Sequence, residues 1–189
     1  MSNGLARREL NRQLFHIVLG ITLLVILLYF GRLKTIYFLS GVLFVGFLLI
    51  NLVIRGIKVP IATWFVETFE RKDAALPGYG SAWYVIGLLI SCLLIPNLSQ
   101  LAAAIVVFAF GDAASTIFGR RGHHPLPYNS KKTIEGTCAF FIFSLMSFIF
   151  VGWYAIPLAL FAALVESLPL GIDDNLTIPL ACSLFFYLI

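Results

Sequence analysis

Seven apolar segments, separated by short polar stretches, run through almost the whole chain. They are Leu14–Phe30, Thr35–Ile54, Ala82–Ile95, Leu98–Phe118, Ile134–Trp153, Ile156–Leu170 and Leu176–Ile189. A helix needs about 20 apolar residues to cross a bilayer, so the third, sixth and seventh segments would be tilted, extended by neighbouring residues or partly inserted. The segments do not alternate between polar and apolar residues, which excludes a β-barrel. The pattern predicts an all-α integral membrane protein with about seven transmembrane helices.

The composition supports this prediction. Hydrophobic residues make up 60% of the chain and charged residues 12%, whereas soluble domains have about 45–50% and about 25%. No internal repeat or low-complexity linker divides the sequence, so we expect a single polytopic membrane domain over residues 1–189. Since no small-residue cleavage site follows the first apolar segment, we interpret that segment as a membrane helix rather than a signal peptide.

The basic residues fall mainly on one side of the predicted membrane. With a cytoplasmic N-terminus, eleven of the 13 lysines and arginines lie on the cytoplasmic side, and only Arg32 and Lys34 lie on the other. This asymmetry is typical of cytoplasmic loops and predicts a cytoplasmic N-terminus. The eleven are Arg7, Arg8, Arg12, Arg55, Lys58, Arg71, Lys72, Arg120, Arg121, Lys131 and Lys132.

The segment between the second and third spans is amphipathic. It reads "IATWFVETFERK", and a helix would place Ile61, Trp64, Phe65 and Phe69 on one face. This arrangement is typical of a short interfacial helix lying along the membrane surface.

Three polar clusters are assigned to the same cytoplasmic face. They are Asp112 with Ser115, the loop from Arg120 to Glu135, and the turn from Asp173 to Thr177. Carboxylates bind magnesium, whereas lysine and arginine neutralise phosphate oxygens. The clusters therefore predict a site on the cytoplasmic face for a substrate that carries both a metal ion and phosphate.

Asp112 is the most informative single residue. On a helix it shares a stripe with Ser115, Thr116 and Gly119, and small residues flank it. A charged residue at the centre of a membrane helix costs at least about 2.5–3.5 kcal/mol, and such residues are functional by default. The alternative is an interfacial carboxylate paired with Arg120.

The loop after Asp112 leads into another helix through the sequence "NSKKTIEG". Ser130 or Thr133 is the expected N-cap. The free N–H groups of a helix start can bind an anion, so Lys132 before it and Glu135 in its first turn resemble a corner for phosphate and metal. Alternatively, the cations anchor lipid headgroups and Glu135 complements the helix dipole.

Two other site types are not predicted in this loop. The chain lacks the G-x-x-x-x-G-K-[ST] motif of Walker-type nucleotide sites. His123 and His124 are adjacent and have no third ligand at helical spacing, so we interpret them as surface histidines rather than a metal pair.

Two further stretches carry candidate residues. After Glu166, the sequence "GIDDNLTIP" brings Asp173, Asp174 and Asn175 together as candidates for ligand or metal binding. Alternatively, Asp174 or Asn175 only caps the last helix. Near the N-terminus, Arg12 and His16 lie four residues apart on one helical stripe and are candidates for contact with a lipid headgroup; His16 is alternatively a satisfied interfacial histidine.

The order of five motifs resembles that of the CTP-dependent lipid alcohol kinases, a family that includes dolichol, phytol and diacylglycerol kinases and is related to membrane cytidylyltransferases. The motifs are "ELNRQLFHIVLG", "LPGYGSAWYVIG", "GDAASTIFGRR", "KKTIEGT" and "DDNLTIP", and together they span most of the chain. The resemblance implies transfer of the γ-phosphate of CTP, with magnesium or another divalent cation, to a long-chain lipid alcohol. It implies no nucleic-acid partner.

The resemblance also implies roles for the candidate residues. The catalytic candidates are Asp112, Lys132, Glu135 and Asp174. The metal candidates are Asp112, Glu135, Asp173 and Asp174. The nucleotide-binding candidates are Ser115, Gly119, Arg120, Lys131, Thr133, Gly136, Asn175 and Thr177.

Two other functions would use a similar set of residues. A membrane cytidylyltransferase would join a lipid phosphate to the α-phosphate of CTP and release pyrophosphate. A transporter without enzymatic activity would place polar residues at mid-bilayer depth. The predicted spans are instead polar mainly at their cytoplasmic ends, which favours an enzyme.

Overall fold

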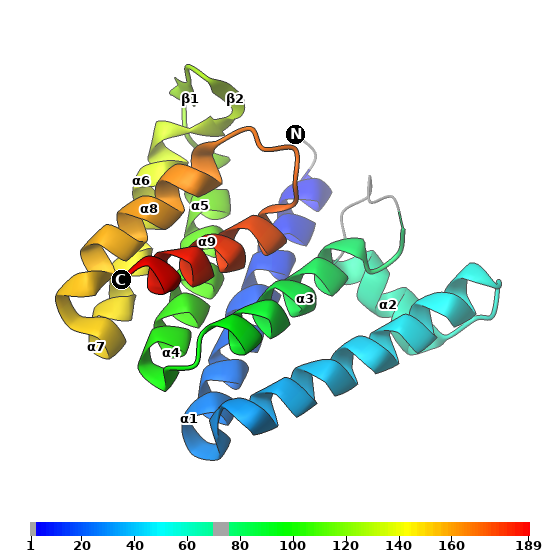
Figure 1. Ribbon diagram of the computed structural model, residues 1–189. Coiled ribbons are helices and arrows are strands. Elements are labelled where there is room, and N and C mark those ends of the chain that lie inside the picture. Colours follow the sequence, from blue (N-terminus) through cyan, green and yellow to red (C-terminus); the bar gives the residue numbers. More distant parts are fainter. Residues whose placement is uncertain (1–2, 70–75) are drawn as a thin grey trace.

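The computed structural model describes residues 3–69 and 76–189, and this part of the chain is almost entirely helical (Figure 1). Arg71 and Lys72 lie outside the described residues. The described strands form one small antiparallel hairpin, β1 Pro125–Leu126 and β2 Asn129–Thr133. The helices are α1 Asn3–Ile54, α2 Pro60–Phe69, α3 Tyr79–Leu94, α4 Leu98–Val106, η1 Val107–Gly111, α5 Asp112–Gly119, α6 Ile134–Ser144, η2 Leu145–Ser147, α7 Phe148–Val151, η3 Gly152–Tyr154, α8 Ala155–Ser167 and α9 Asp174–Leu188.

The long element α1 is a hairpin of two helical arms. Gly31, with φ 79° and ψ 173°, interrupts the helical conformation, and glycine adopts this positive φ without a Cβ clash. Figure 1 shows the chain turning back near this point, and the second arm diverges from the first toward α2. The two arms contain the first two apolar segments of the sequence.

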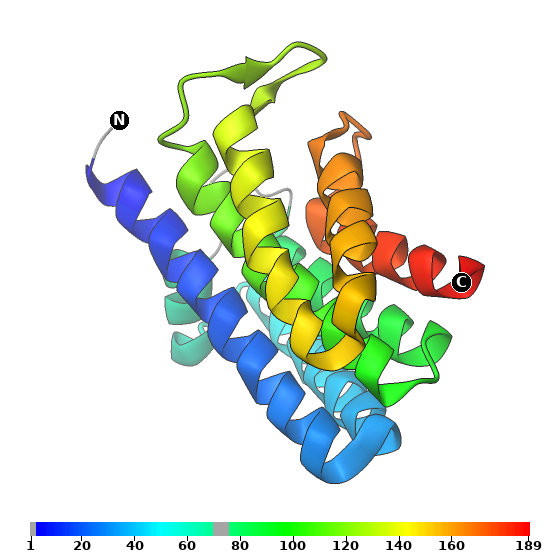
Figure 2. The same cartoon turned by 90° about the vertical axis from the view of Figure 1, so that its left-hand side faces the viewer.

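The centre of the molecule is the continuous stretch α4–η1–α5, from Leu98 to Gly119 (Figure 2). Residues 101–109 of this stretch are all buried, and many of them are alanines, whose small side chains let neighbouring helices approach closely. Its middle is a π-helix, η1, which ends immediately before Asp112. A π-helical turn inside an α-helix is rare and is frequently found at functional sites.

Helix α9 packs along α3. Gly87 of α3 leaves room for the backbone of Asn175 and for the ring of Pro179, because a Cβ at Gly87 would collide with both. Ser91 of α3 donates a hydrogen bond to the carbonyl of Pro179 at 3.2 Å. These contacts fix the first half of α9 against the second half of α3.

The described chain has the features of an all-α membrane protein. Three of its helical stretches are long and apolar enough to cross a membrane, namely Arg8–Ile54, Leu98–Gly119 and Ile134–Ser167. Large apolar side chains such as Phe44 and Ile149 are exposed on its surface, as expected for helices in contact with lipid. Helices α3 and α9 are shorter apolar helices, and α2 forms where the amphipathic helix was predicted. The β-hairpin lies near the end of α5 and the start of α6 (Figure 1).

Candidate active site

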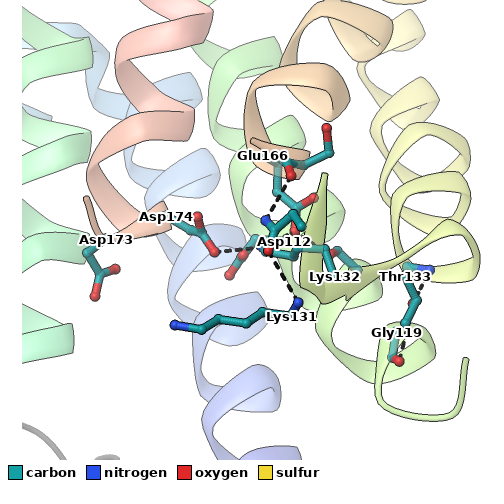
Figure 3. A network of polar contacts seen from close by, with 12 residues as sticks. Asp112, Gly119, Lys131, Lys132, Thr133, Glu166, Asp173 and Asp174 are labelled. Atoms are coloured by element: carbon teal, nitrogen blue, oxygen red, sulfur yellow. Dashed lines mark hydrogen bonds and ion pairs between the residues drawn. The ribbon is translucent and has the colours of Figure 1, made fainter. Parts of the chain in front are cut away.

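Lys132 joins two acidic side chains from separate helices (Figure 3). Its Nζ donates hydrogen bonds to Oδ2 of Asp174, at 2.8 Å, and to Oε1 of Glu166. Lys132 lies on β2, Glu166 lies near the end of α8 and Asp174 begins α9. Two of the three predicted polar clusters therefore meet at Lys132.

The β-hairpin holds Lys132 in this position. The hydroxyls of Tyr128 and Ser167 share a hydrogen bond of 2.8 Å, and Nδ2 of Asn129 donates to the carbonyl of Ser167 at 2.9 Å. Both contacts tie the hairpin to the end of α8, next to Glu166. The sequence pattern predicts a loop for this segment, whereas the structure forms a β-hairpin.

Glu166 links the lysine to the central helix. Ser115 of α5 donates a hydrogen bond of 2.6 Å to the same carboxylate oxygen, Oε1, that accepts from Lys132. The Glu166 side chain is 1% exposed, and its Oε2 is buried with no hydrogen-bond partner among the described residues. A buried carboxylate oxygen without a partner is costly, so Oε2 is a free acceptor position for a bound group.

Asp112 lies beside this network (Figure 3). It is buried, 7% exposed, and is the first residue of α5 directly after the π-helix η1. Its Oδ2 is 3.9 Å from Nδ1 of His16, a distance too long for a hydrogen bond. Within the described chain, His16 Nδ1 also has no hydrogen-bond partner. Asp112 and His16 therefore face each other as two buried polar groups with unused hydrogen-bonding capacity.

Tyr84 of α3 fixes His16 and its backbone. The Tyr84 hydroxyl donates to the His16 carbonyl at 2.9 Å, and the two ring centroids are 4.4 Å apart. Gly20, one helical turn further along α1, packs directly on Ala109 of η1. The first arm of α1 is thus held tightly against the helix that carries Asp112.

The site has more negative than positive groups. The carboxylates of Glu166 and Asp174 contact the ammonium of Lys132, and the Asp112 carboxylate lies beside them. Burial by itself would lower the pKa of Lys132, but the charges of Glu166 and Asp174 outweigh burial and raise that pKa above its ordinary value. Lys132 is therefore protonated throughout the physiological range, and the remaining negative charge favours a bound cation.

The carboxylates would suit a magnesium ion whose other ligands are water and substrate phosphates. Among residues 3–69 and 76–189, no three His, Cys, Asp or Glu side chains are grouped closely enough to hold a metal ion by themselves. Magnesium is usually held by only one or two carboxylates together with water and substrate phosphates. The buried Asp112 carboxylate and the free Oε2 of Glu166 supply ligands of that kind.

Glu135 has different partners from the other acidic candidates. Its carboxylate accepts hydrogen bonds from the backbone N–H groups of His123, at 2.8 Å, and His124, at 3.4 Å, and lies 2.7 Å from the His124 ring. It lies in the first turn of α6. The N-cap of this helix is Thr133, one of the two residues predicted for that position. Glu135 therefore holds the loop that precedes the hairpin, and its metal role stays a prediction.

The residues of the turn before α9 have different roles: one caps the helix, and others contact neighbouring segments. Asp173 is the N-cap of α9 and accepts from the N–H of Asn175 at 3.0 Å, so the alternative in which Asp174 or Asn175 is the cap was wrong. Asn175 donates from Nδ2 to the Gly80 carbonyl at 3.2 Å, and Thr177 is buried. Asp174 is the residue of this turn that reaches Lys132.

The basic candidates near the N-terminus form an ion-pair cluster. Glu9 lies 2.5 Å from Arg12 and 3.4 Å from Arg120. This cluster connects the start of α1 with the end of α5, close to His16. Lys131 is exposed, and its backbone N–H donates to Oδ1 of Asn129.

Known proteins resemble this chain along nearly its whole length. An uncharacterised protein of Methanocaldococcus jannaschii is 36% identical over 91% of this chain and 89% of its own length. Phytol kinase 1 of Arabidopsis thaliana is 27% identical over 96% of this chain, and farnesol kinase of the same plant is 26% identical over 98%. The chain belongs to the lipid alcohol kinase family. It spans about two thirds of the two plant kinases, 67% of each. No family model and no solved structure matches the chain.

Two site residues of this lipid alcohol kinase family member were not predicted from its sequence. Glu166 ends an apolar run, which is the kind of signal that singles out Asp112, but the sequence pattern alone gives Glu166 no role. Tyr84 lies in the motif "LPGYGSAWYVIG", but nothing in the sequence indicates that its hydroxyl bonds the His16 carbonyl.

Gly119 and Gly136, predicted as nucleotide contacts, lie against each other where α5 crosses α6. A Cβ at Gly136 would lie 3.0 Å from both the Gly119 Cα and the Ser115 carbonyl oxygen. Gly136→Ala should therefore destabilise the fold by about 1–3 kcal/mol, the usual cost of overpacking. The measurement is thermal unfolding in one detergent.

The matched control is Gly41→Ala, because a Cβ at Gly41 meets no described atom within 4 Å. This variant should unfold at or slightly above the wild-type temperature. Equal unfolding temperatures for Gly136→Ala and the wild type would show that the two helices separate easily, and the packing role of Gly136 would be wrong.

Proposed function

We propose that the protein is a membrane-embedded kinase that transfers the γ-phosphate of CTP to the hydroxyl of a long-chain isoprenoid alcohol. The observation that carries the proposal is the network in which Lys132 bridges Glu166 and Asp174 beside the buried Asp112. The names of the similar plant proteins, phytol kinase and farnesol kinase, support an isoprenoid acceptor. The preference for CTP comes from the motif resemblance.

In the proposed membrane arrangement the chain crosses the bilayer seven times, with its N-terminus and its active site in the cytoplasm. The water-soluble nucleotide would approach from the cytoplasm, while the alcohol stays in the leaflet with its hydroxyl at headgroup depth. Holding both reactants in line can contribute on the order of 7–11 kcal/mol to lowering the barrier.

Phosphoryl transfer depends mainly on positioning and electrostatic stabilisation. Lys132 supplies a fixed positive charge for the oxygens of the transferred group, held in place by Glu166 and Asp174. Asp112 and Glu166 would hold magnesium, which when bound neutralises charge on the nucleotide phosphates. The acceptor oxygen forms a bond to the γ-phosphorus, the bond from that phosphorus to the bridging oxygen breaks, and CDP leaves.

The proton of the acceptor hydroxyl needs a base. Asp174 is engaged by Lys132 at 2.8 Å, so its carboxylate is less free to turn toward the acceptor hydroxyl. Asp112 carries no such ion pair to Lys132 in the structure, and the Nδ1 of His16 lies 3.9 Å from its carboxylate. We therefore assign Asp112 as the group that receives the proton, with His16 and Arg12 beside the acceptor headgroup.

The deciding experiment uses purified protein in nanodiscs with phytol and magnesium. CTP labelled at the γ-phosphate should give labelled phytyl phosphate, and CTP labelled at the α-phosphate should leave the lipid unlabelled. A cytidylyltransferase acting on a lipid phosphate would give the reverse pattern. Absence of label in phytol, farnesol and diacylglycerol with both CTP and ATP would overturn the proposal.

A further inference from the structure

A groove of about 640 Å³ lies between the second arm of α1, helix α2 and the start of α3. In Figure 1, α2 sits between the second arm and α3. The residues lining it on the second arm run from Tyr37 to Val53, which is about 24 Å of helix at about 1.5 Å per residue. The volume lies within the range of small-molecule sites, about 300–1,000 Å³.

The lining of this groove is chemically uniform. Among its described lining residues, only Tyr37 and Ser81 carry a polar side-chain group, and none is charged. Gly41 and Gly46 widen it, because a Cβ at either position would meet no described atom within 4 Å. Such a surface can bind a hydrocarbon chain but offers nothing to recognise a headgroup.

One side of the groove is open. Tyr37, Phe47 and Ile61, which line it, are 61%, 51% and 75% exposed. In an apolar part of the molecule this open side faces lipid, so a membrane-dissolved chain can enter sideways without crossing water.

The other end of the groove adjoins the candidate active site. Ser81 and Val85 line the groove, and between them Tyr84 bonds the His16 carbonyl at 2.9 Å. Asn175, next to Asp174, bonds the Gly80 carbonyl at 3.2 Å. Phe65 of the groove packs on Phe15, the neighbour of His16, with ring centroids 5.2 Å apart. Contacts of the start of α3 and the start of α1 thus link this end of the groove to His16, which faces Asp112.

We propose that this groove binds the hydrocarbon chain of the isoprenoid alcohol and so holds the hydroxyl at the start of α3, facing Asp112. The inference rests on the proposed kinase function, because only an alcohol substrate requires its chain and its hydroxyl to be placed together. The chain extends from Ser81 toward Tyr37, deeper in the membrane. A longer isoprenoid chain reaches further along the second arm, past Gly46 and then Gly41.

The first test measures binding without catalysis. A phytol analogue with a photoreactive diazirine on its chain is irradiated with the wild-type protein in nanodiscs, without nucleotide, and the labelled peptides are identified. Labelling should concentrate on α2, the second arm of α1 and the start of α3, and excess phytol should suppress it. Labelling of other helices, or labelling that phospholipid suppresses as well as phytol does, would overturn the inference.

This test separates the two proposals. Phytol-suppressed labelling in the groove without any phosphorylation would overturn the kinase function but keep a lipid alcohol site. Phosphorylation of phytol with labelling elsewhere would keep the kinase and overturn the groove. Crosslinks joining the second arms of two chains would show that another copy fills the groove, which also overturns the inference.

The second test fills the groove. Gly46→Phe, whose ring would enter the open space, should lower kcat/KM for phytol by about tenfold or more, since pockets discriminate chains by steric fit. Gly41→Phe lies deeper and should impair phytol more than the shorter geraniol. Leu48→Phe, on the same arm but outside the groove lining, is the matched control and should behave like the wild type. Equal loss for geraniol and phytol in Gly41→Phe would contradict the proposed chain direction.

Discussion

Replacing Asp112 with asparagine should lower phosphoryl transfer to phytol by at least about hundredfold, the usual contribution of a positioned acid or base. The substitution keeps the shape of the side chain and removes its charge and basicity. Asp112 is buried, sits directly after the π-helix η1 and faces His16 at 3.9 Å without a hydrogen bond. Its carboxylate is therefore available to a substrate proton or a metal ion and is not engaged in a hydrogen bond to His16.

The loss should appear in kcat while the protein still inserts and unfolds normally. Removing a buried charge that lacks a close partner costs the fold little, so the unfolding temperature should stay near that of the wild type or rise. Arg121→Ala provides the control, because this exposed arginine follows Arg120 outside the network and should leave turnover unchanged. Wild-type turnover in Asp112→Asn would remove Asp112 from the mechanism.

The convergence of Asp112, Lys132 and Asp174 was predictable from the sequence because charge asymmetry assigns all three to one face of the membrane. Their partners were not predictable. Whether Lys132 meets Glu166 or Glu135 depends on the rotation of α8 and α6 about their axes, and apolar segments exposed to lipid on one side do not define that rotation. The hairpin that carries Lys132 is also too short to leave a strand pattern in the sequence.

The turn at Gly31 is a second case in which the sequence predicts the helices but not the way in which they pack. The polar gap between Phe30 and Thr35 predicted two spans, and the structure places one arm on each side of Gly31. The outward angle of the second arm, which creates the groove with α2 and α3, depends on contacts among three separate segments. No local feature of the sequence reports such an angle.

Replacing Lys132 with methionine should reduce phosphoryl transfer by on the order of 10²–10³, the effect of removing one group that stabilises transition-state charge. Unlike the Asp112 variant, this one should also destabilise the fold. It leaves Glu166, which is 1% exposed, with an uncompensated charge, and breaking a buried ion pair by removing one partner costs about 3–5 kcal/mol. A lower unfolding temperature should therefore accompany the lost activity.

A double variant separates these two effects. Adding Glu166→Gln to Lys132→Met removes the uncompensated carboxylate, while the amide oxygen can still accept from Ser115, which lies 2.6 Å from that side chain in the wild type. The unfolding temperature should recover by a measurable part of the loss, yet transfer should stay low, because no ammonium is left to neutralise the transferred phosphoryl group. If activity returned together with stability, Lys132 would be a structural residue whose charge only balances Glu166, and the phosphoryl-binding role would have to pass to another cation such as Arg120.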